Sequence, residues 1–237
     1  MKRMVQKWLF AAVAALMAMG LSTASADEVY VEAFGSSLFT SDVERTMATT
    51  PGVGGSGIVL GYEPEAFAGA RVMVGYDGAG YTNRFLFDGD VEGRWARNRV
   101  MAMGDWGYDL VGPWLRPMVR LGVGYSHQRL DLSTSDADYR GTDHGISALV
   151  AGGLEASFGR DGDIGEELMS WDRFSLGLNV LLGYAWQSRA DFDSMETAEE
   201  IDEDDDPWQR GSYDAGSLDM SGMTFSMGLM LRYRFGQ

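Results

Sequence analysis

Hydrophobic and polar residues alternate strictly in the last third of the chain. Between residues 173 and 187, one face of an extended chain would carry Phe174, Leu176, Leu178, Val180, Leu182, Tyr184 and Trp186. The opposite face would carry Arg173, Ser175, Gly177, Asn179, Leu181, Gly183, Ala185 and Gln187. A period of two predicts a β-strand. Strands of soluble proteins usually have about five or six residues, so a run of about fourteen favours a strand that crosses a membrane.

The end of the sequence repeats this pattern. Apolar side chains alternate with small or charged ones from Met223 to Phe235, and the second face includes Arg232 and Arg234. Arginine on that face requires a polar interior. The same alternation is present in six earlier segments, at residues 28–39, 56–63, 69–76, 99–109, 115–128 and 146–158.

These eight segments predict an all-β protein, an eight-stranded antiparallel up-and-down transmembrane β-barrel. Lipid offers no hydrogen-bonding partner to the edge of a sheet, so the barrel must close. The predicted connections alternate in length, with short ones at 63–68, 109–113 and 158–171 and long ones at 40–55, 77–98, 129–145 and 188–221. In outer-membrane barrels the short turns are periplasmic and the long loops are extracellular. Both termini should therefore face the periplasm.

Aromatic residues fall near the ends of the predicted strands. Trp and Tyr prefer the two interfaces of a membrane. The topology places Tyr76, Tyr125, Tyr184 and Trp186 at the outer rim. At the inner rim it places Tyr62, Trp106, Tyr108, Tyr233 and Phe235. A soluble ligand-binding barrel of the lipocalin type has no reason for such aromatic girdles.

The first 26 residues have the pattern of a secretory signal peptide. Lys2, Arg3 and Lys7 precede a short apolar run from Trp8 to about Gly20, and Ala24-Ser25-Ala26 matches a cleavage site. We expect cleavage after Ala26 and export through the Sec pathway. An uncleaved N-terminal anchor is the alternative. The sequence has no cysteine, which excludes a lipoprotein anchor, a disulfide framework and a thiolate metal site.

Composition limits the remaining possibilities. Residues 27–237 are sufficient for one domain. They carry 16 arginines and no lysine against 35 acidic residues, which gives a formal charge of −19. A nucleic-acid partner is disfavoured, because phosphate binding needs a basic face. No apolar run after the signal approaches 18 residues, which argues against transmembrane helices.

Three segments resemble a known family. The run Trp114-Leu115-Arg116-Pro117-Met118-Val119-Arg120-Leu121-Gly122-Val123-Gly124-Tyr125-Ser126 is similar to the "RPYVGAGVGYS" strand of small outer-membrane barrels. That family includes the transmembrane domain of outer-membrane protein A, outer-membrane protein X and porin-like proteins. The segments Ala151-Gly152-Gly153-Leu154-Glu155 and Leu231-Arg232-Tyr233-Arg234-Phe235 extend the resemblance. It implies a monomer in the bacterial outer membrane, assembled by the insertion machinery and surrounded by lipid and lipopolysaccharide.

Eleven charged residues should point into the barrel. An eight-stranded barrel encloses a lumen that side chains fill, and a buried charge without a partner costs several kcal/mol. We therefore expect a salt-bridge network that closes the bore; the alternative is an ion-conducting pore. The predicted set is Glu32, Glu63, Arg71, Arg99, Asp105, Arg116, Arg120, Glu155, Arg173, Arg232 and Arg234.

Two other patterns favour ordinary loops over catalytic or cofactor sites. Gly52-Val53-Gly54-Gly55-Ser56-Gly57 matches the dinucleotide fingerprint, but it precedes an expected strand and opens no helix, so we interpret it as a flexible outer loop. His127 and His144 flank the third outer loop, where lipid A-modifying enzymes use a histidine. The neighbouring residues do not match those enzymes, and we expect no catalytic residues and no cofactor.

The segment from Asp191 to Asp219 is strongly acidic and includes the run 202–206. Like charges repel, so the simplest interpretation is a solvated extracellular loop. A sharper hypothesis is that Asp202, Asp204, Asp205 and Asp206 share divalent cations with lipopolysaccharide phosphates. The leading functional prediction is a structural or surface-interaction barrel with four extracellular loops. A lipid A-modifying enzyme and a small-solute porin are the alternatives.

Overall fold

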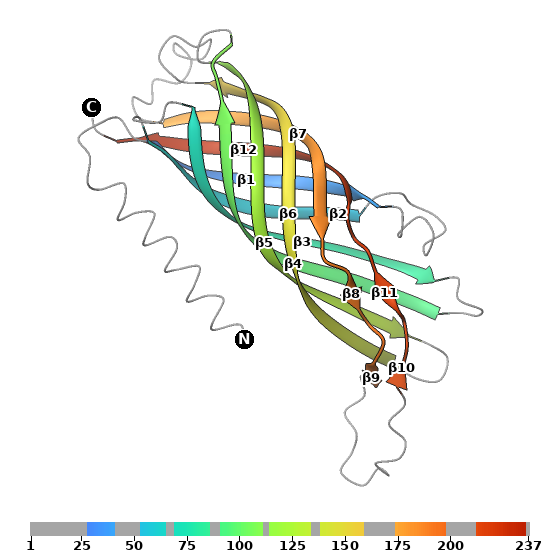
Figure 1. Cartoon of the computed structure of the whole chain (residues 1–237). Helices are drawn as coiled ribbons and strands as arrows, with labels where there is room; N and C mark the ends of the chain where they lie inside the picture. The colour runs from blue at the N-terminus through green and yellow to red at the C-terminus, as the bar shows by residue number, and fades with distance from the viewer. Residues whose placement is uncertain are drawn as a thin grey trace.

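The chain folds into a closed antiparallel β-barrel (Figure 1). The computed structural model describes residues 28–40, 53–64, 69–85, 91–110, 114–133, 138–158, 174–197 and 212–235. Within them, eight long strands form the wall: β1 (Glu28–Phe39), β2 (Val53–Glu63), β3 (Ala70–Phe85), β4 (Val91–Gly107), β5 (Leu115–Ser133), β6 (Asp138–Phe158), β7 (Phe174–Gln187) and β12 (Gly222–Arg234).

Closure follows from the pairing of the first and last strands. Each long strand pairs with its neighbours in the sequence, and β12 pairs with both β7 and β1. The register between β1 and β12 runs from Glu28 opposite Arg234 to Phe39 opposite Met223. Within the described residues, the eight wall strands therefore form a closed ring of pairings. The predicted eight-stranded up-and-down barrel is confirmed.

Four short strands belong to the segment that follows β7. They are β8 (Ala190–Asp191), β9 (Met195–Thr197), β10 (Ser212–Tyr213) and β11 (Ser217–Leu218). β8 pairs with β11, whereas β9 pairs with β10 and with the beginning of β6. The described parts of this segment are thus ordered against the barrel rather than forming a plain loop.

Two of the predicted long connections are wrong. β3 continues to Phe85 and β4 begins at Val91, so most of 77–98 is strand. β5 continues to Ser133 and β6 begins at Asp138, so most of 129–145 is strand as well. These two hairpins extend the wall on the side of β8 to β11 (Figure 1).

A reversal of side-chain polarity explains why the sequence pattern missed the extensions. Along β5 the outward positions change from apolar to polar after Tyr125, while the inward positions change from polar to apolar after Gln128. The outward series is Val119, Leu121, Val123, Tyr125, His127, Arg129 and Asp131, and the inward series includes Arg116, Arg120, Gln128, Leu130 and Leu132. Polar and apolar residues continue to alternate beyond Tyr125, but the apolar side chains now point inward and the polar ones outward.

The glycine-rich segment that resembled a dinucleotide fingerprint is a strand and not the flexible loop that we expected. Residues 53–57 belong to β2 and pair with both β1 and β3. A Cβ atom on Gly57 would lie 2.5 Å from the Tyr76 carbonyl oxygen and 2.6 Å from the Phe34 ring. Glycine here allows close packing inside the barrel wall, which accounts for the motif without a ligand.

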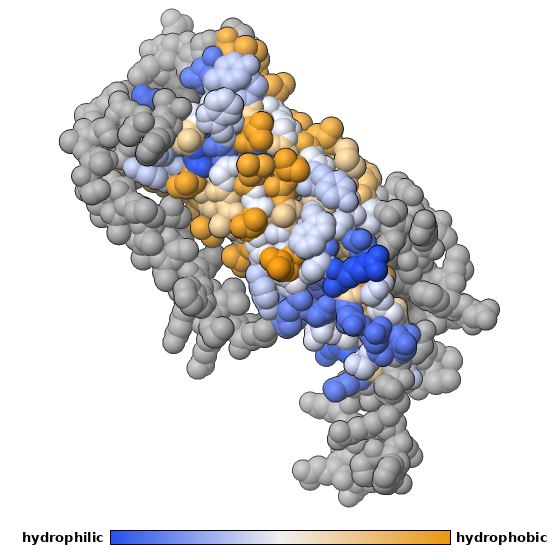
Figure 2. Space-filling model, viewed as in Figure 1, coloured by the Kyte–Doolittle hydropathy of each residue, from blue (hydrophilic) through white to orange (hydrophobic). Residues whose placement is uncertain are grey.

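The outward face of the barrel is apolar near one end. Large hydrophobic side chains are exposed on all eight wall strands, including Val31, Ile58, Val72, Trp106, Leu121, Val150, Leu182 and Leu229. On the face drawn in Figure 2, hydrophobic side chains gather in a band toward the end where β12 finishes, with hydrophilic residues toward β8 and β11. We call this band the apolar belt; it ends at Tyr125 on β5. No helix in the described ranges is long and apolar enough to span a membrane.

Aromatic residues mark both borders of the apolar belt. Tyr76, Tyr125, Tyr184 and Trp186 are exposed at one border, as are Trp106 and Tyr108 at the other. At that second border the rings of Phe174, Tyr233 and Phe235 contact one another. Tyr62 differs from the prediction, because only 9% of it is exposed. The predicted signal peptide and residues 159–171 of the third short connection lie outside the described residues.

The tight interior predicts which glycines tolerate a side chain. A Cβ atom on Gly61 would lie 2.1 Å from the Tyr30 ring, which is buried in the bore, whereas a Cβ on Gly152 meets nothing nearer than 3.9 Å. Gly61→Ala should therefore destabilise the barrel by about 1–3 kcal/mol, as overpacking does. Gly152→Ala is the matched control, and urea unfolding in detergent measures both. Equal stability of the two variants would contradict this packing.

Candidate functional site: the charged bore

Ten of the eleven charged residues predicted to face the interior do so. Nine of them are at most 9% exposed, and Arg234 is partly buried at the end of β12; the set is Glu32, Glu63, Arg71, Arg99, Asp105, Arg116, Arg120, Glu155, Arg232 and Arg234. They come from all of the wall strands except β7, whose inward residues include Ser175, Asn179 and Gln187. Arg173 lies outside the described residues.

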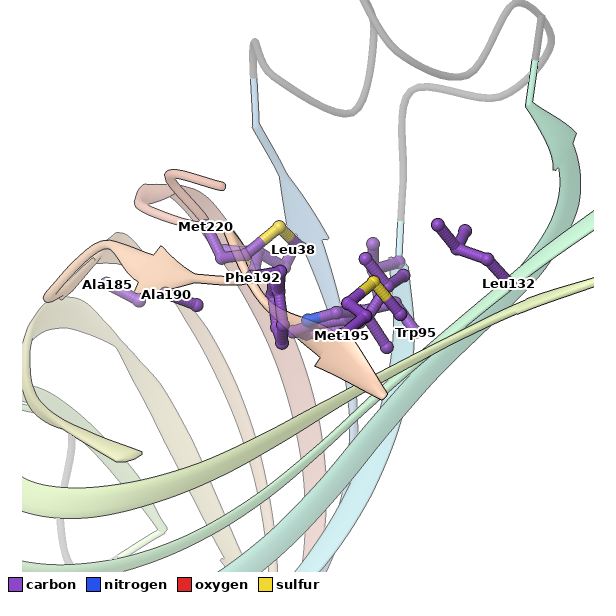
Figure 3. Packing of buried hydrophobic residues seen from close by; sticks show 10 residues of the cluster. Leu38, Trp95, Leu132, Ala185, Ala190, Phe192, Met195 and Met220 are labelled. Carbon is purple, nitrogen blue, oxygen red and sulfur yellow. The ribbon is translucent and has the colours of Figure 1, made fainter. Parts of the chain in front are cut away.

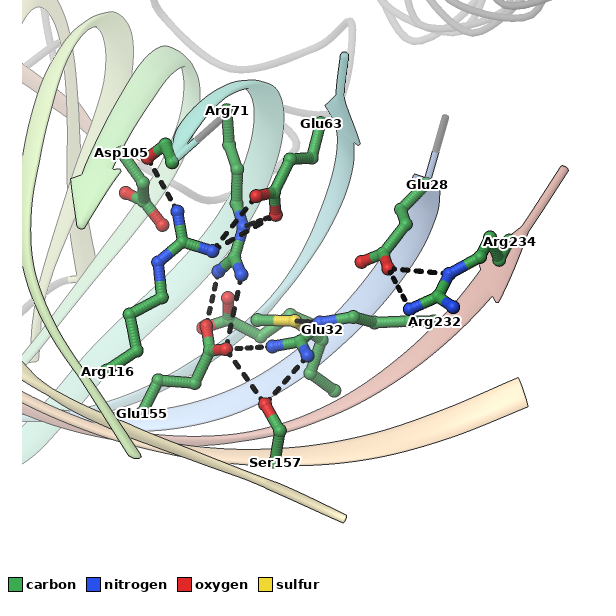
Figure 4. A network of polar contacts seen from close by, with 12 residues as sticks. Glu28, Glu32, Glu63, Arg71, Asp105, Arg116, Glu155, Ser157, Arg232 and Arg234 are labelled. Atoms are coloured by element: carbon green, nitrogen blue, oxygen red, sulfur yellow. Dashed lines mark hydrogen bonds and ion pairs between the residues drawn. The ribbon is translucent and has the colours of Figure 1, made fainter. Parts of the chain in front are cut away.

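Glu155 on β6 is the centre of the first group of contacts (Figure 4). Its carboxylate accepts hydrogen bonds from Arg71 on β3 and from Arg232 on β12. Ser157 Oγ donates to it at 3.2 Å and accepts a hydrogen bond from Arg232 Nη1 at 2.8 Å. A single fully buried carboxylate thereby joins three strands across the bore.

Glu63 extends this group toward the end of the barrel where β1 begins and β12 ends (Figures 1 and 4). It accepts a hydrogen bond from Arg71 Nε at 2.6 Å and one from Arg116 Nη1 at 3.0 Å. Arg116 also donates through Nη2 to the Gly69 carbonyl oxygen at 2.6 Å. Gly69 has a φ of +93°, and its position next to β3 lets the backbone oxygen reach the guanidinium.

Arg120 on β5 forms the second group of contacts. Its Nε and Nη2 donate to the two oxygens of Asp105 at 2.8 and 3.0 Å. Its Nη1 and Nη2 donate to the two oxygens of Glu32 at 3.1 and 2.8 Å. Bidentate pairing of this kind fixes the planar guanidinium between two carboxylates. Arg120 thus connects β5 with β4 and with β1 on the opposite wall.

The prediction missed two further groups of charges in the bore. Asp77 accepts hydrogen bonds from Arg99 Nε at 2.9 Å and from Arg97 Nη2 at 3.3 Å. Glu28 accepts from Arg234 Nε at 3.2 Å. Asp77 and Arg97 fell in the segment that we expected to be a loop. Their odd numbers continue the inward phase of Arg71 and Arg99, and this signal could have identified them.

These contacts leave little open space in the middle of the barrel. A cavity of about 40 Å³ lies between the Arg120 group and the Asp77 group, lined also by apolar residues such as Leu149 and Leu181. A water molecule needs a cavity of roughly 10–15 Å³ on this measure. The cavity therefore holds a few waters at most. Burial of so many ions is tolerable because each carboxylate is paired.

An apolar cluster covers the bore at the end away from the termini. Phe192, Met195 and Met220 from the segment after β7 and before β12 pack on Trp95 of β4 and on Leu38 of β1 (Figure 3). The remaining members are Val53, Leu130, Leu132, Ala185 and Ala190. Trp95 Nε1 donates a hydrogen bond to Gln128 Oε1 at 3.2 Å. We call this cluster the mouth cap, because it closes the bore above the Asp77 group.

Ion pairs also form on the outside of the wall beyond the apolar belt. Asp131 contacts Arg129 and Arg140, each at 2.8 Å, and all three side chains are partly exposed. Partial burial raises the pKa of the Asp131 carboxyl, but hydrogen bonds from Arg129 and Arg140 outweigh it and place this pKa below its usual value. Such exposed pairs contribute about 0–1 kcal/mol to stability.

The other candidate residues lie away from the bore. His127 and His144 face outward on β5 and β6 and contact each other, which the sequence did not indicate. Asp202, Asp204, Asp205 and Asp206 lie outside the described residues, so their role in cation binding stays a prediction. Within the described ranges, no group of three or more His, Cys, Asp or Glu side chains is placed to hold a metal ion.

Neither a family model nor a curated protein matches the sequence. Among solved structures, Neisserial surface protein A is 12% identical, with 88% of this chain and 97% of that chain covered and a TM-score of 0.42. Ail, the attachment invasion locus protein of Yersinia pestis, solved with the heparin analogue sucrose octasulfate, is 11% identical over 89% and 99% of the chains, with a TM-score of 0.44.

The N-terminal β-barrel domain of OprF from Pseudomonas aeruginosa is 15% identical over 88% and 97% of the chains, with a TM-score of 0.35. These similarities are too low to transfer a function. The class of the protein instead rests on its own topology and interior. It is a closed eight-stranded antiparallel barrel with an apolar belt outside and a charged bore inside.

The position of Glu155 predicts a large effect of its removal. Glu155→Gln removes the negative charge that Arg71 and Arg232 share, and breaking a buried ion pair costs about 3–5 kcal/mol. Asp131→Asn, the matched exposed control, should cost about 1 kcal/mol or less. Urea unfolding of both variants in detergent measures the difference. Similar losses would show that the bore contacts are no stronger than surface ones.

Proposed function

We propose that this protein is an integral β-barrel of a bacterial outer membrane, with a closed bore and a structural or surface-interaction role. The observation that carries the proposal is the combination of an exposed apolar belt with a fully buried ionic interior. Soluble proteins rarely expose contiguous apolar patches larger than a few hundred Å². Hydrocarbon around the barrel accounts for the apolar outward face, because these side chains are then not exposed to water.

The height of the apolar belt supports this proposal. On β7 the exposed apolar residues run from Phe174 to Trp186. At about 3.3 Å per residue this stretch is about 40 Å long. A tilt of about 40°, usual for such barrels, reduces it to about 30 Å along the membrane normal. The hydrocarbon core of a bilayer is about 30 Å thick.

The proposed orientation places both termini in the periplasm and the mouth cap outside. β1 begins and β12 ends at the same end of the barrel, whereas the extended hairpins and β8 to β11 lie at the other end (Figure 1). Long extracellular extensions and short periplasmic turns are the rule in outer-membrane barrels. The expected signal peptide supports export, after which the assembly machinery would insert the chain as a monomer next to lipopolysaccharide.

A structural role is favoured over a porin because two features occlude the bore. The groups around Glu155 and Arg120 and the hydrogen bond from Arg97 to Gln187 cross it, and the mouth cap covers its outer end. What remains for function is the outer end of the wall, where β4 exposes Arg94 and Asn98 and β6 exposes Arg140 and Thr142. Binding residues commonly lie on such ends of a rigid scaffold.

We do not propose a catalytic role. A hydrolytic site would need a nucleophile and a base within hydrogen-bonding reach. In the described part of the chain, the ring nitrogens of His127 and His144 contact only each other and the Tyr125 hydroxyl. Within the described residues, no serine or carboxylate is hydrogen-bonded to either imidazole ring, so the set of groups that the sequence suggested for a lipid A-modifying enzyme is not assembled there.

Planar-bilayer recording tests the closed bore. Protein taken from the outer-membrane fraction, and shown to be folded by heat-modifiable migration on gels, should give no stable large conductance. The triple variant Glu32→Ala, Asp105→Ala and Arg120→Ala removes two carboxylates and the guanidinium between them, so it should conduct measurably more. Asp131→Ala is the matched control, since it removes a carboxylate outside the bore and should leave the protein as closed as before. Stable conductance of the unmodified protein would contradict the closed bore. Absence of the protein from outer-membrane fractions would contradict the proposed location.

A further inference from the structure

The two histidines of this chain lie opposite each other on the outer surface of the barrel. His127 on β5 and His144 on β6 are register partners, and the sequence has no other histidine and no cysteine. Their Nδ1 atoms are 3.3 Å apart, and their ring centroids are 4.6 Å apart. Two scarce ligand side chains from strands joined by a hairpin thus converge on one point.

This separation suits a shared metal ion. Zinc binds imidazole nitrogen at about 2.0–2.1 Å with tetrahedral angles, which places two such nitrogens about 3.3–3.4 Å apart. A third donor is close, because the Tyr125 hydroxyl oxygen lies 2.7 Å from His144 Nδ1 and the tyrosine ring stacks on the imidazole. The ring planes are inclined by only 30°, so the rings must rotate for both Nδ1 lone pairs to point at one ion.

We propose that His127 and His144 form a two-histidine site for a divalent transition-metal cation such as Zn²⁺. Imidazole suits zinc, copper and nickel, whereas calcium and magnesium prefer oxygen ligands. Two protein ligands leave the other coordination positions to water or to the Tyr125 oxygen. The site is therefore open rather than closed, and its binding is reversible.

The surroundings favour access by a cation. The histidine pair is the first outward pair beyond Tyr125, where the apolar belt ends and the outward face becomes polar. Arg129, the nearest positive charge on β5, shares the Asp131 carboxylate with Arg140. The Asp143 carboxylate accepts a hydrogen bond from the His144 backbone N–H at 2.7 Å and places a negative charge beside the pair. The whole chain carries a formal charge of −16, which attracts cations.

The site is also held in place before the metal arrives. β5 and β6 share a continuous register on both sides of the pair, from Leu115 opposite Ala156 to Ser133 opposite Asp138. Two ligands fixed on paired strands bind as a chelate, with little loss of backbone entropy. The proposal goes beyond the closed barrel and does not depend on whether the bore conducts.

Calorimetric titration with Zn²⁺ tests this site in the full-length folded protein, purified without a histidine tag. We expect one equivalent to bind, and His127→Ala or His144→Ala to weaken binding by on the order of a hundredfold as the chelate is lost. Thr142→Ala, the next outward position on β6, is the matched control and should bind as the unmodified protein does. Both histidines are on the surface, and heat-modifiable migration checks that each variant is folded.

Three results would overturn the site. The first is that the unmodified protein shows no saturable Zn²⁺ binding, and the second is that saturable binding survives both histidine substitutions. The third is loss of binding when the histidines are intact but four aspartates are changed to Asn, since this would assign the ion to the acidic segment; these are Asp202, Asp204, Asp205 and Asp206. Electron paramagnetic resonance with Cu²⁺ gives an independent readout, and hyperfine splitting from two nitrogens is expected.

Discussion

The whole barrel depends on the pairing of the charges that are buried in its bore. The contact between Glu155 and the guanidinium groups of Arg71 and Arg232 is the central example. Because the outward face of the wall is apolar within the belt, polar side chains at that height can lie only inside, and the inside of eight strands is too narrow to hydrate them fully. Each buried charge must then be neutralised by a side chain from another strand. The ion pairs of Glu155 and of Arg120 with Glu32 therefore specify which strands face each other across the bore, and at what height.

The same constraint explains how much of the fold the sequence revealed. Where strands are surrounded by the apolar belt, as in β7 and β12, large apolar residues alternate with small or polar ones, and the predicted phase agrees with the structure. Beyond the belt the phase inverts, because the outward positions are polar and the apolar side chains turn inward to form the mouth cap. Polar and apolar residues still alternate regularly there, as in the series from His127 to Leu132. The last apolar outward residue on β5, however, is Tyr125.

The sequence predicted most of the charged residues in the bore, because the alternation along a strand determines which side chains point inward. Once a strand and its phase are known, an inward arginine or glutamate follows from its number, as for Arg71 and Glu155. Asp77 and Arg97 were not predicted to face the bore, because the predicted strands covered only residues 69–76 and 99–109. The partners themselves were not predictable, since Glu155 and Arg71 are 84 residues apart and meet only after the barrel closes. The contact between His127 and His144 likewise requires the register of the extended β5–β6 hairpin, which local sequence does not fix.

Spin labels on single cysteines along β7 test the central claim most directly, because the chain contains no cysteine of its own. In lipid vesicles, labels at positions 178, 180 and 182 should collide freely with oxygen, which concentrates in hydrocarbon, and poorly with a water-soluble nickel complex. Labels at positions 179, 181 and 183 face the filled bore and should collide poorly with both reagents. If the labels at 178, 180 and 182 instead collide freely with the nickel complex, the apolar belt faces water and this account of the barrel is wrong.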